Sequence, residues 1–170
     1  MKNISFRNDV LPLKNELYRL ALRITLNNAE AEDIVQETLI RVWKKKDEWE
    51  NIDSIEAFSL TICRNLSLDH TKKMEKVDFT LDNDSHDSED ISPNPYEQLT
   101  QNDRVELVKR LINELPERQR SVMQLRDVEG KSYKEISIIL NMSEEQVKIN
   151  IFRARQRIKQ KYSELENYGL

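Results

Sequence analysis

The residues best suited to bind a charged ligand lie near the end of the chain, at 132–161. No acidic residue occurs between Gln146 and Ser163, and six cationic side chains do: Lys148, Arg153, Arg155, Arg157, Lys159 and Lys161. Apolar residues recur there at helical spacing: Val147, Ile151, Ala154 and Ile158. A helix with an apolar back and a cationic front has the chemistry to enter the phosphate-lined major groove of DNA.

Two helix starts predict how this cationic segment is positioned. Ser132 with Glu135, and Ser143 with Gln146, are capping boxes in which a serine hydroxyl accepts a backbone N–H and the later side chain accepts the serine N–H. The interval between them leaves room for one short helix and a tight turn at 141–142, the spacing of a helix-turn-helix. The alternative is a solvated charged face that binds nothing.

Composition predicts amphipathic helices with hydrated outer faces. Of the 170 residues, 38% are hydrophobic and 34% are charged, with two glycines and four prolines. The net charge of −4 is unevenly spread, because residues 82–98 hold six acids and no Lys or Arg. Removing these six leaves −4 + 6 = +2 for the remainder, so the local charge is a better guide to binding than the total.

Several functional classes are not expected. Cys63 is the single cysteine, so no intrachain disulfide or multi-cysteine zinc site can form. No apolar run reaches the roughly 18 residues that cross a bilayer, and the N-terminus lacks a signal-peptide core. We expect a soluble, cytoplasmic protein without membrane insertion, metal or cofactor. No nucleophile–base pair or phosphate loop is visible, so we do not expect an enzyme.

The periodicity predicts an all-α chain. Helices are expected at 11–26, at 29–46 with Asn28 as N-cap, and from Ser54 to about Lys76. The acidic stretch after them predicts a flexible linker. A further helix is expected from Tyr96 or Leu99 up to Pro116, then a short one over 116–127 before Gly130, and finally the helix-turn-helix.

Three motifs together resemble the extracytoplasmic-function (ECF) group of bacterial sigma-70 factors. They are DIVQETLIRVW at 33–43, TICRNLSLDH at 61–70, and LPERQRSVMQLRDVEGKSYKEIS at 115–137, closed by SEEQVKINIFRARQRI. The resemblance implies two small helical domains: a region 2 bundle at 1–77 and a region 4 helix-turn-helix unit at 99–170, joined by the acidic linker at 78–98. It also implies promoter recognition and DNA strand opening as a subunit of RNA polymerase.

Family members dock one helix on the beta-prime clamp of core polymerase, while the beta flap is a further implied contact. The matching residues here are Asp33, Gln36, Glu37 and Arg41. Asp33, Gln36 and Glu37 share one helical face and could pair with arginines of a partner helix. The alternative is a solvated charged face. Trp43 is expected in the core rather than at this contact.

The third helix resembles the family element that melts and reads the minus-ten promoter region. The residues implied are Arg64, Asn65, Asp69, His70, Lys72 and Lys73. Phe58 and Cys63 replace a tryptophan and an alanine common in the family. Asn65 and Asp69, one turn apart, could instead form a structural pair. Cys63 on an apolar face is not expected to be a redox sensor.

In region 4 the resemblance implies minus-thirty-five recognition by the last helix. The residues implied are Ser143, Glu145, Gln146, Lys148, Ile149, Phe152, Arg153, Arg155 and Arg157. Glu145, Lys148, Ile149 and Phe152 are expected toward bases, and the three arginines toward phosphates. Arg118, Arg120 and Lys131 are further phosphate candidates.

Two other readings concern partners. A dimeric helix-turn-helix repressor or activator would explain the C-terminal unit but not Asp33, Gln36 and Glu37. An anti-sigma factor that clamps the two regions together is a possible regulator by analogy with the family.

Overall fold

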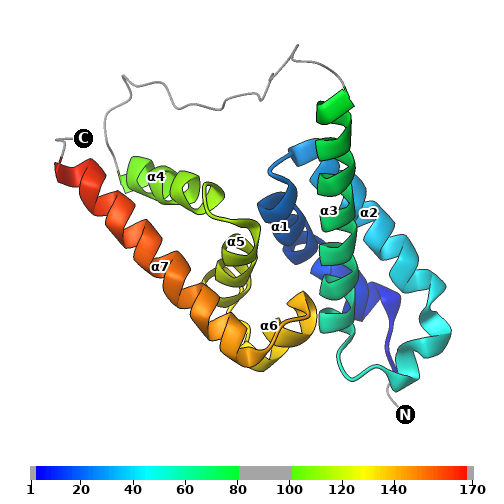
Figure 1. Cartoon of the computed structure of the whole chain (residues 1–170). Coiled ribbons are helices and arrows are strands. Elements are labelled where there is room, and N and C mark those ends of the chain that lie inside the picture. The colour runs from blue at the N-terminus through cyan, green and yellow to red at the C-terminus, as the bar shows by residue number, and fades with distance from the viewer. Residues whose placement is uncertain (1–2, 81–100, 168–170) are drawn as a thin grey trace.

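The structure, a computed structural model, describes residues 3–80 and 101–167, and every regular element within them is a helix (Figure 1). The first half contains η1 (Phe6–Val10), η2 (Leu11–Leu13), α1 (Lys14–Thr25), α2 (Asn28–Lys44), η3 (Lys46–Asn51) and α3 (Ile55–Thr80). The second half contains α4 (Gln101–Asn113), α5 (Glu117–Met123), η4 (Gln124–Val128), α6 (Tyr133–Leu140) and α7 (Glu144–Asn167). The all-α prediction is confirmed.

The helix predicted at 11–26 is divided. Pro12 lies in the short η2 segment, where its missing N–H costs little, and α1 starts only at Lys14. The chain reverses at Leu26, whose φ of 57° is left-handed. Asn27 then caps α2 by accepting the N–H of Glu30 at 3.1 Å. The expected cap at Asn28 is therefore wrong by one residue, because adjacent asparagines offer the same chemistry and only backbone geometry decides between them.

The long helix α3 starts as predicted. The Ser54 hydroxyl accepts the N–H of Ala57 at 3.1 Å, which satisfies one unpaired donor of the first turn. Its inner face buries Leu60, Cys63 and Leu66. The helix continues past the expected end at Lys76 to Thr80, and residues 81–98 of the predicted linker lie outside the described residues.

Local signals in the second half are confirmed. Pro116 directly precedes α5, and Gly130 adopts a left-handed φ of 72° before α6. The Ser132 capping box is complete: its hydroxyl accepts the Glu135 N–H at 3.1 Å, and its own N–H donates to the Glu135 carboxylate at 3.3 Å. Asn141, with φ 51°, reverses the chain between α6 and α7. These turns produce the predicted helix-turn-helix.

The two halves pack against each other, an arrangement that the sequence does not predict. Within the first half α1, α2 and α3 pack together, and within the second half α5, α6 and α7 do so. Between the halves α3 contacts α6 and α1 contacts α5, with α6 lying beside the lower part of α3 in Figure 1. Leu20 and Ile24 of α1 belong to the same buried cluster as Val122 and Leu125 of the second half. The apolar core is thus continuous across the chain.

Candidate functional site

The helix α7 turns a mixed polar and apolar face to solvent. Val147, Ile151 and Ala154 are buried against α5 and α6, which fixes the rotation of the helix. Glu145 and Lys148 are therefore exposed, as predicted. So are two large apolar residues, Ile149 at 47% and Phe152 at 61%. Exposed apolar side chains among charges on the second helix of a helix-turn-helix are suited to thymine methyl groups in the major groove.

Ser143 and Gln146, both predicted site residues, form the N-terminal cap of this helix. The Gln146 N–H donates to the Ser143 hydroxyl at 3.1 Å, and the Ser143 N–H donates to the Gln146 side-chain oxygen at 3.0 Å. This reciprocal pair is the predicted capping box. Both side chains remain exposed. Their observed contacts orient the start of α7, and with it Glu145 and Lys148.

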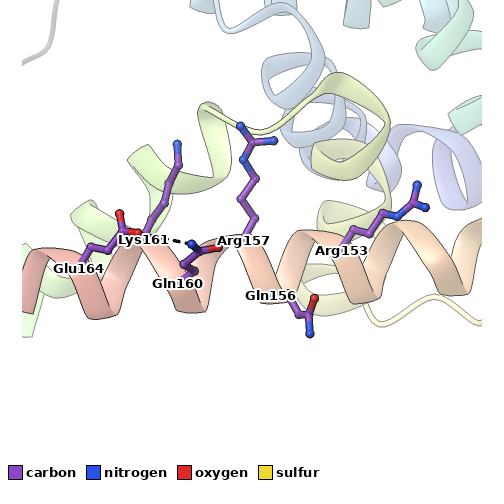
Figure 2. Close-up of a pocket in the computed structure, with 6 residues that line it drawn as sticks. All are labelled: Arg153, Gln156, Arg157, Gln160, Lys161 and Glu164. Atoms are coloured by element: carbon purple, nitrogen blue, oxygen red, sulfur yellow. Dashed lines mark hydrogen bonds between the residues drawn. The ribbon is translucent and has the colours of Figure 1, made fainter.

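The three predicted phosphate-binding arginines differ in their surroundings. Arg155 donates two hydrogen bonds to Asp127, at 2.5 and 3.2 Å, which ties α7 to η4. The hydrogen bond from Arg155 to Asp127 raises the pKa of the guanidinium, opposed in part by slight burial. Arg153 and Arg157 are exposed and form no ion pair within the described residues. Figure 2 shows Arg153, Arg157 and Lys161 extending from one side of α7, with Gln156 on the opposite side.

On α3 the six predicted residues form a polar band along the helix. Asn65, Asp69, Lys72 and Lys73 are exposed, and Arg64 and His70 are half-buried. The Arg64 guanidinium donates to the Asn65 side-chain oxygen at 3.3 Å, while its Nε is buried without a partner. Asn65 is thus bonded to its neighbour, which favours Arg64 over Asp69 as its structural partner. The cationic end of the band, Lys72 and Lys73, is available to a phosphate backbone.

On α2 the predicted protein-binding residues are accessible. Asp33, Gln36 and Arg41 are exposed and Glu37 is half-buried. Arg41 donates to Glu37 at 2.9 Å, an i,i+4 pair on the helix surface. Because this pair is exposed, it contributes little to stability. The acids and the amide therefore remain available to a partner.

Two apolar residues extend this α2 surface. Ile40 and Trp43 are 53% and 48% exposed, on the face that also carries Gln36. The expectation that Trp43 lies in the core is wrong. Trp49 occupies that core position instead, with 7% exposure and its indole N–H donating to the Val42 carbonyl at 3.0 Å. Trp43 covers Trp49 edge-on, at 6.3 Å between ring centroids.

A groove beside this face was missed by sequence reasoning. It lies between α1 and α2, encloses about 370 Å³, and is lined by Lys14, Asn15, Tyr18, Glu32, Val35 and Gln36. Only Gln36 among these was predicted to bind a partner. These residues come from two helices and share no pattern in the sequence, so only packing could reveal the groove.

The thiol of Cys63 is not accessible to solvent. Its side chain is fully buried and its sulfur lies 3.3 Å from the Leu17 carbonyl oxygen. Burial raises the pKa of the thiol to about 12, so the reactive thiolate does not form near neutral pH. Within 3–80 and 101–167 there is no cluster of His, Cys, Asp and Glu that could hold a metal ion. In the same ranges no helix combines the length and apolar character needed to cross a membrane.

Comparison with known proteins gives matches in both halves. The sequence matches the family described as Sigma-70 region 2 over residues 10–77, and Sigma-70, region 4 over residues 106–158. It is 30% identical over 151 residues to the ECF RNA polymerase sigma factor SigM of Bacillus subtilis, covering 88% of this chain and 90% of that protein. It is 32% identical over 149 residues to the ECF RNA polymerase sigma factor SigE of Mycolicibacterium smegmatis, covering 85% of this chain and 56% of that protein.

The fold has solved relatives as well. It is similar to the sigma factor RpoE of Bartonella quintana, whose co-crystal structure is with the anti-sigma factor NepR. The TM-score is 0.75 and the identity 28%, over 91% of this chain and 94% of that chain. The similarity therefore extends over both halves and not over the helix-turn-helix alone.

Proposed function

Since the chain belongs to the ECF group of sigma-70 factors, and thus acts in promoter recognition and transcription initiation, we propose that it divides three binding tasks among α2, α3 and α7. The observation that carries this proposal is the exposure of a distinct set of functional side chains on each of the three helices. Contacts within the fold occupy part of each set: Arg41 pairs with Glu37 on α2, Arg64 with Asn65 on α3, and Arg155 with Asp127 on α7, where Ser143 and Gln146 also form the cap.

The surface of α2 is proposed to bind core RNA polymerase. Asp33, Gln36 and Glu37 offer oxygen acceptors to cationic side chains of the clamp, and Ile40 and Trp43 add exposed apolar area beside them. Aromatic and aliphatic anchors surrounded by polar groups are typical of protein–protein contacts that exclude water. We also propose that the region 2 domain, which carries α2, ends at residue 77 and that the region 4 domain begins at residue 99.

The polar band of α3 is proposed to bind the melted minus-ten strand. A separated strand offers unstacked bases and an unshielded phosphate backbone. We expect the exposed Lys72 and Lys73 to neutralise phosphates. Arg64, Asn65 and Asp69 are expected to hydrogen-bond base edges or sugars. Binding the open strand more tightly than the duplex is what shifts the equilibrium toward strand opening.

The outer face of α7 is proposed to read the minus-thirty-five duplex. Glu145 can accept from a cytosine amino group, and Ile149 or Phe152 can contact a thymine methyl group. Lys148 lies 5.7 Å from the Tyr133 ring centroid, which gives its otherwise flexible chain a preferred position at the edge of this face. An anti-sigma factor is a further proposed partner, because the solved relative RpoE was crystallised with one.

The proposal is tested by in-vitro transcription with purified core polymerase and a library of promoter fragments. We expect initiation only when the chain is added. Lys148→Ala should change the preferred minus-thirty-five bases, since base contacts determine sequence choice. Gln36→Ala should lower transcription from all promoters equally. Core polymerase that initiates no better with the chain than without it would refute the proposed function.

A further inference from the structure

The Trp43 ring near the end of α2 is exposed to solvent and yet contacts three other side chains. The Phe6 ring lies 5.3 Å from it between centroids, at an interplanar angle of 78°, and the Trp49 ring lies 6.3 Å from it at 70°. Edge-on pairs of this kind are favoured by the charge distribution of aromatic rings. The Lys46 ammonium nitrogen lies over the ring, 4.8 Å from its centroid. Together these contacts restrict the rotation of an indole that is 48% exposed.

The short helix η1 brings Phe6 to this ring. Ser5 caps the start of η1, because the Asn8 N–H donates to the Ser5 hydroxyl at 3.4 Å and the Ser5 N–H donates to the Asp9 carboxylate at 2.7 Å. A reciprocal pair of this kind fixes the backbone at the start of a helix. Phe6 is the first residue of η1, so local hydrogen bonds set the direction of the chain from which its ring projects.

The other end of η1 is anchored in the bundle. Val10, its last residue, is fully buried in one apolar cluster with Val42 and Trp49. Phe6 is half-buried and packs against the same cluster. Residues 5–10 are therefore attached to the bundle at both ends of η1, and the Phe6–Trp43 contact is built on a buried base.

The position of Trp43 on α2 is that of a binding anchor. The apolar cluster beneath it has its own buried tryptophan, Trp49, whereas Trp43 leaves about half of its surface to solvent. Gln36, Ile40 and Trp43 follow one another at i, i+4 and i+7, so they share one face of the helix. A large aromatic side chain that is already oriented loses little conformational freedom on binding, which favours affinity.

We propose that residues 5–10 form a brace that holds Trp43 ready to bind core RNA polymerase, with Phe6 as a positioning residue for that contact. The name N-terminal brace is used for residues 5–10. The proposal rests on the assignment of α2 to polymerase binding in the proposed function. Phe6 acts through Trp43, whose exposed half meets the partner.

The side chains along this face specify the chemistry of the partner surface. Asp33 and Glu37 lie toward the start of α2, Ile40 and Trp43 follow, and Lys46 lies just beyond the end of the helix. Asp33 and Trp43 are about 15 Å apart along the axis at about 1.5 Å per residue. A complementary surface presents a cation opposite the two acids, an apolar side chain opposite Ile40 and Trp43, and an acid near Lys46. This change of sign along the face fixes the direction in which the partner lies.

The test combines affinity for core polymerase with fluorine NMR of the full chain labelled with 5-fluorotryptophan. The chain has two tryptophans, so the spectrum has one signal from Trp43 and one from the buried Trp49, and Trp43→Ala assigns them. Phe6→Ala removes the ring contact, Phe6→Leu keeps an apolar side chain without a ring, and Phe6→Tyr keeps the ring. Leu26→Ala, which truncates an apolar residue 46% exposed beyond the end of α1, is the matched control.

We expect Phe6→Ala and Phe6→Leu to lower the affinity for core polymerase about three- to tenfold, the effect of losing one aromatic pair. Phe6→Tyr and Leu26→Ala should bind as wild type does. In free Phe6→Ala and Phe6→Leu the Trp43 signal should move toward that of a tryptophan in water, while Trp49 keeps the signal of a buried ring. Phe6→Leu decides the matter if Phe6→Ala loses the Trp49 signal and hence its fold.

A double-mutant cycle shows whether Phe6 acts through Trp43. In a Trp43→Ala background, Phe6→Ala should lower the affinity no further, because the ring that it positions is gone. Three results would overturn the proposal: wild-type affinity in Phe6→Leu, a loss in Phe6→Tyr as large as in Phe6→Leu, or additive losses of Phe6→Ala and Trp43→Ala.

The same titrations separate this proposal from the proposed function. If Gln36→Ala and Trp43→Ala weaken polymerase binding while Phe6→Leu does not, the brace alone is refuted and α2 keeps its assignment. If the chain does not bind core polymerase, or if neither Gln36→Ala nor Trp43→Ala changes its affinity, the assignment of α2 is wrong and the brace falls with it.

Discussion

The three arginines on α7 should respond differently to the same substitution. Glutamine removes the positive charge of each and keeps a polar side chain of similar reach. Arg155 already satisfies its guanidinium with two hydrogen bonds to Asp127, whereas Arg153 and Arg157 are exposed and form no ion pair in the described part of the chain. We therefore predict that Arg153→Gln and Arg157→Gln weaken promoter binding. Arg155→Gln should instead lower the folding stability of region 4.

The expected sizes follow from the interactions of each arginine. Removing one arginine–phosphate pair lowers the magnitude of the slope of log affinity against log salt by about 0.9. When salt is raised from about 50 to about 200 mM, the loss of affinity should therefore be roughly 3.5-fold smaller in a single variant than in wild type. The Arg155–Asp127 pair has partners 51% and 35% exposed, so removing it should cost only about 0.5–1 kcal/mol of folding free energy.

The assay is fluorescence anisotropy of a labelled promoter duplex titrated with polymerase holoenzyme at several salt concentrations. The double variant Arg153→Gln with Arg157→Gln should reduce the slope by about 1.8, because the two arginines bind separate phosphates. Thermal unfolding of the chain alone supplies the stability measurement. Equal slope changes for all three arginines would refute the assignment, and so would an unchanged slope for Arg153→Gln and Arg157→Gln.

Three further predictions concern α2, the α7 cap and the buried thiol. Gln36→Ala should weaken binding to core polymerase about tenfold in a sedimentation assay, whereas Glu50→Ala, exposed on η3, should not; equal effects would contradict the α2 assignment. Ser143→Ala should lose about 1 kcal/mol of stability and melt about 2–4 °C lower, while Ser163→Ala, within α7 and outside any cap, should not. Burial raises the pKa of Cys63 from 9.0 to about 12, so the unfolded thiol ionises first as pH rises. The stability of wild type relative to Cys63→Ala should therefore be constant below about pH 9 and fall between there and about pH 12 in urea titrations; a constant difference across this range would refute it.

Local chemistry made much of the fold predictable. Ser54, Ser132 and Ser143 each cap the helix that the sequence assigned to them, because a cap needs only a side chain and the next few residues. Pro116 and Gly130 punctuate the chain where expected for the same reason. The buried stripe of α7 followed from its period, and the exposure of its functional face followed from the stripe.

Relations between distant residues were beyond this reasoning. The Arg120 contact with the end of α1, and the pairing of Lys131 with Glu16, depend on how two helical units pack, which no local pattern encodes. A cationic side chain has the same appearance in sequence whether it binds phosphate or a helix terminus. Trp43 and Trp49 show the same limit, because both suit a core and only the path of η3 decides which is buried.

The most direct test of the proposed division of binding tasks is gel filtration of the purified chain, alone and with core RNA polymerase, each with and without a promoter duplex. We expect a monomer that co-elutes with core polymerase through its α2 face and binds the duplex stably only in that complex. A chain that elutes as a dimer, ignores polymerase and binds the duplex by itself would contradict this division, and would identify an ordinary helix-turn-helix repressor or activator instead.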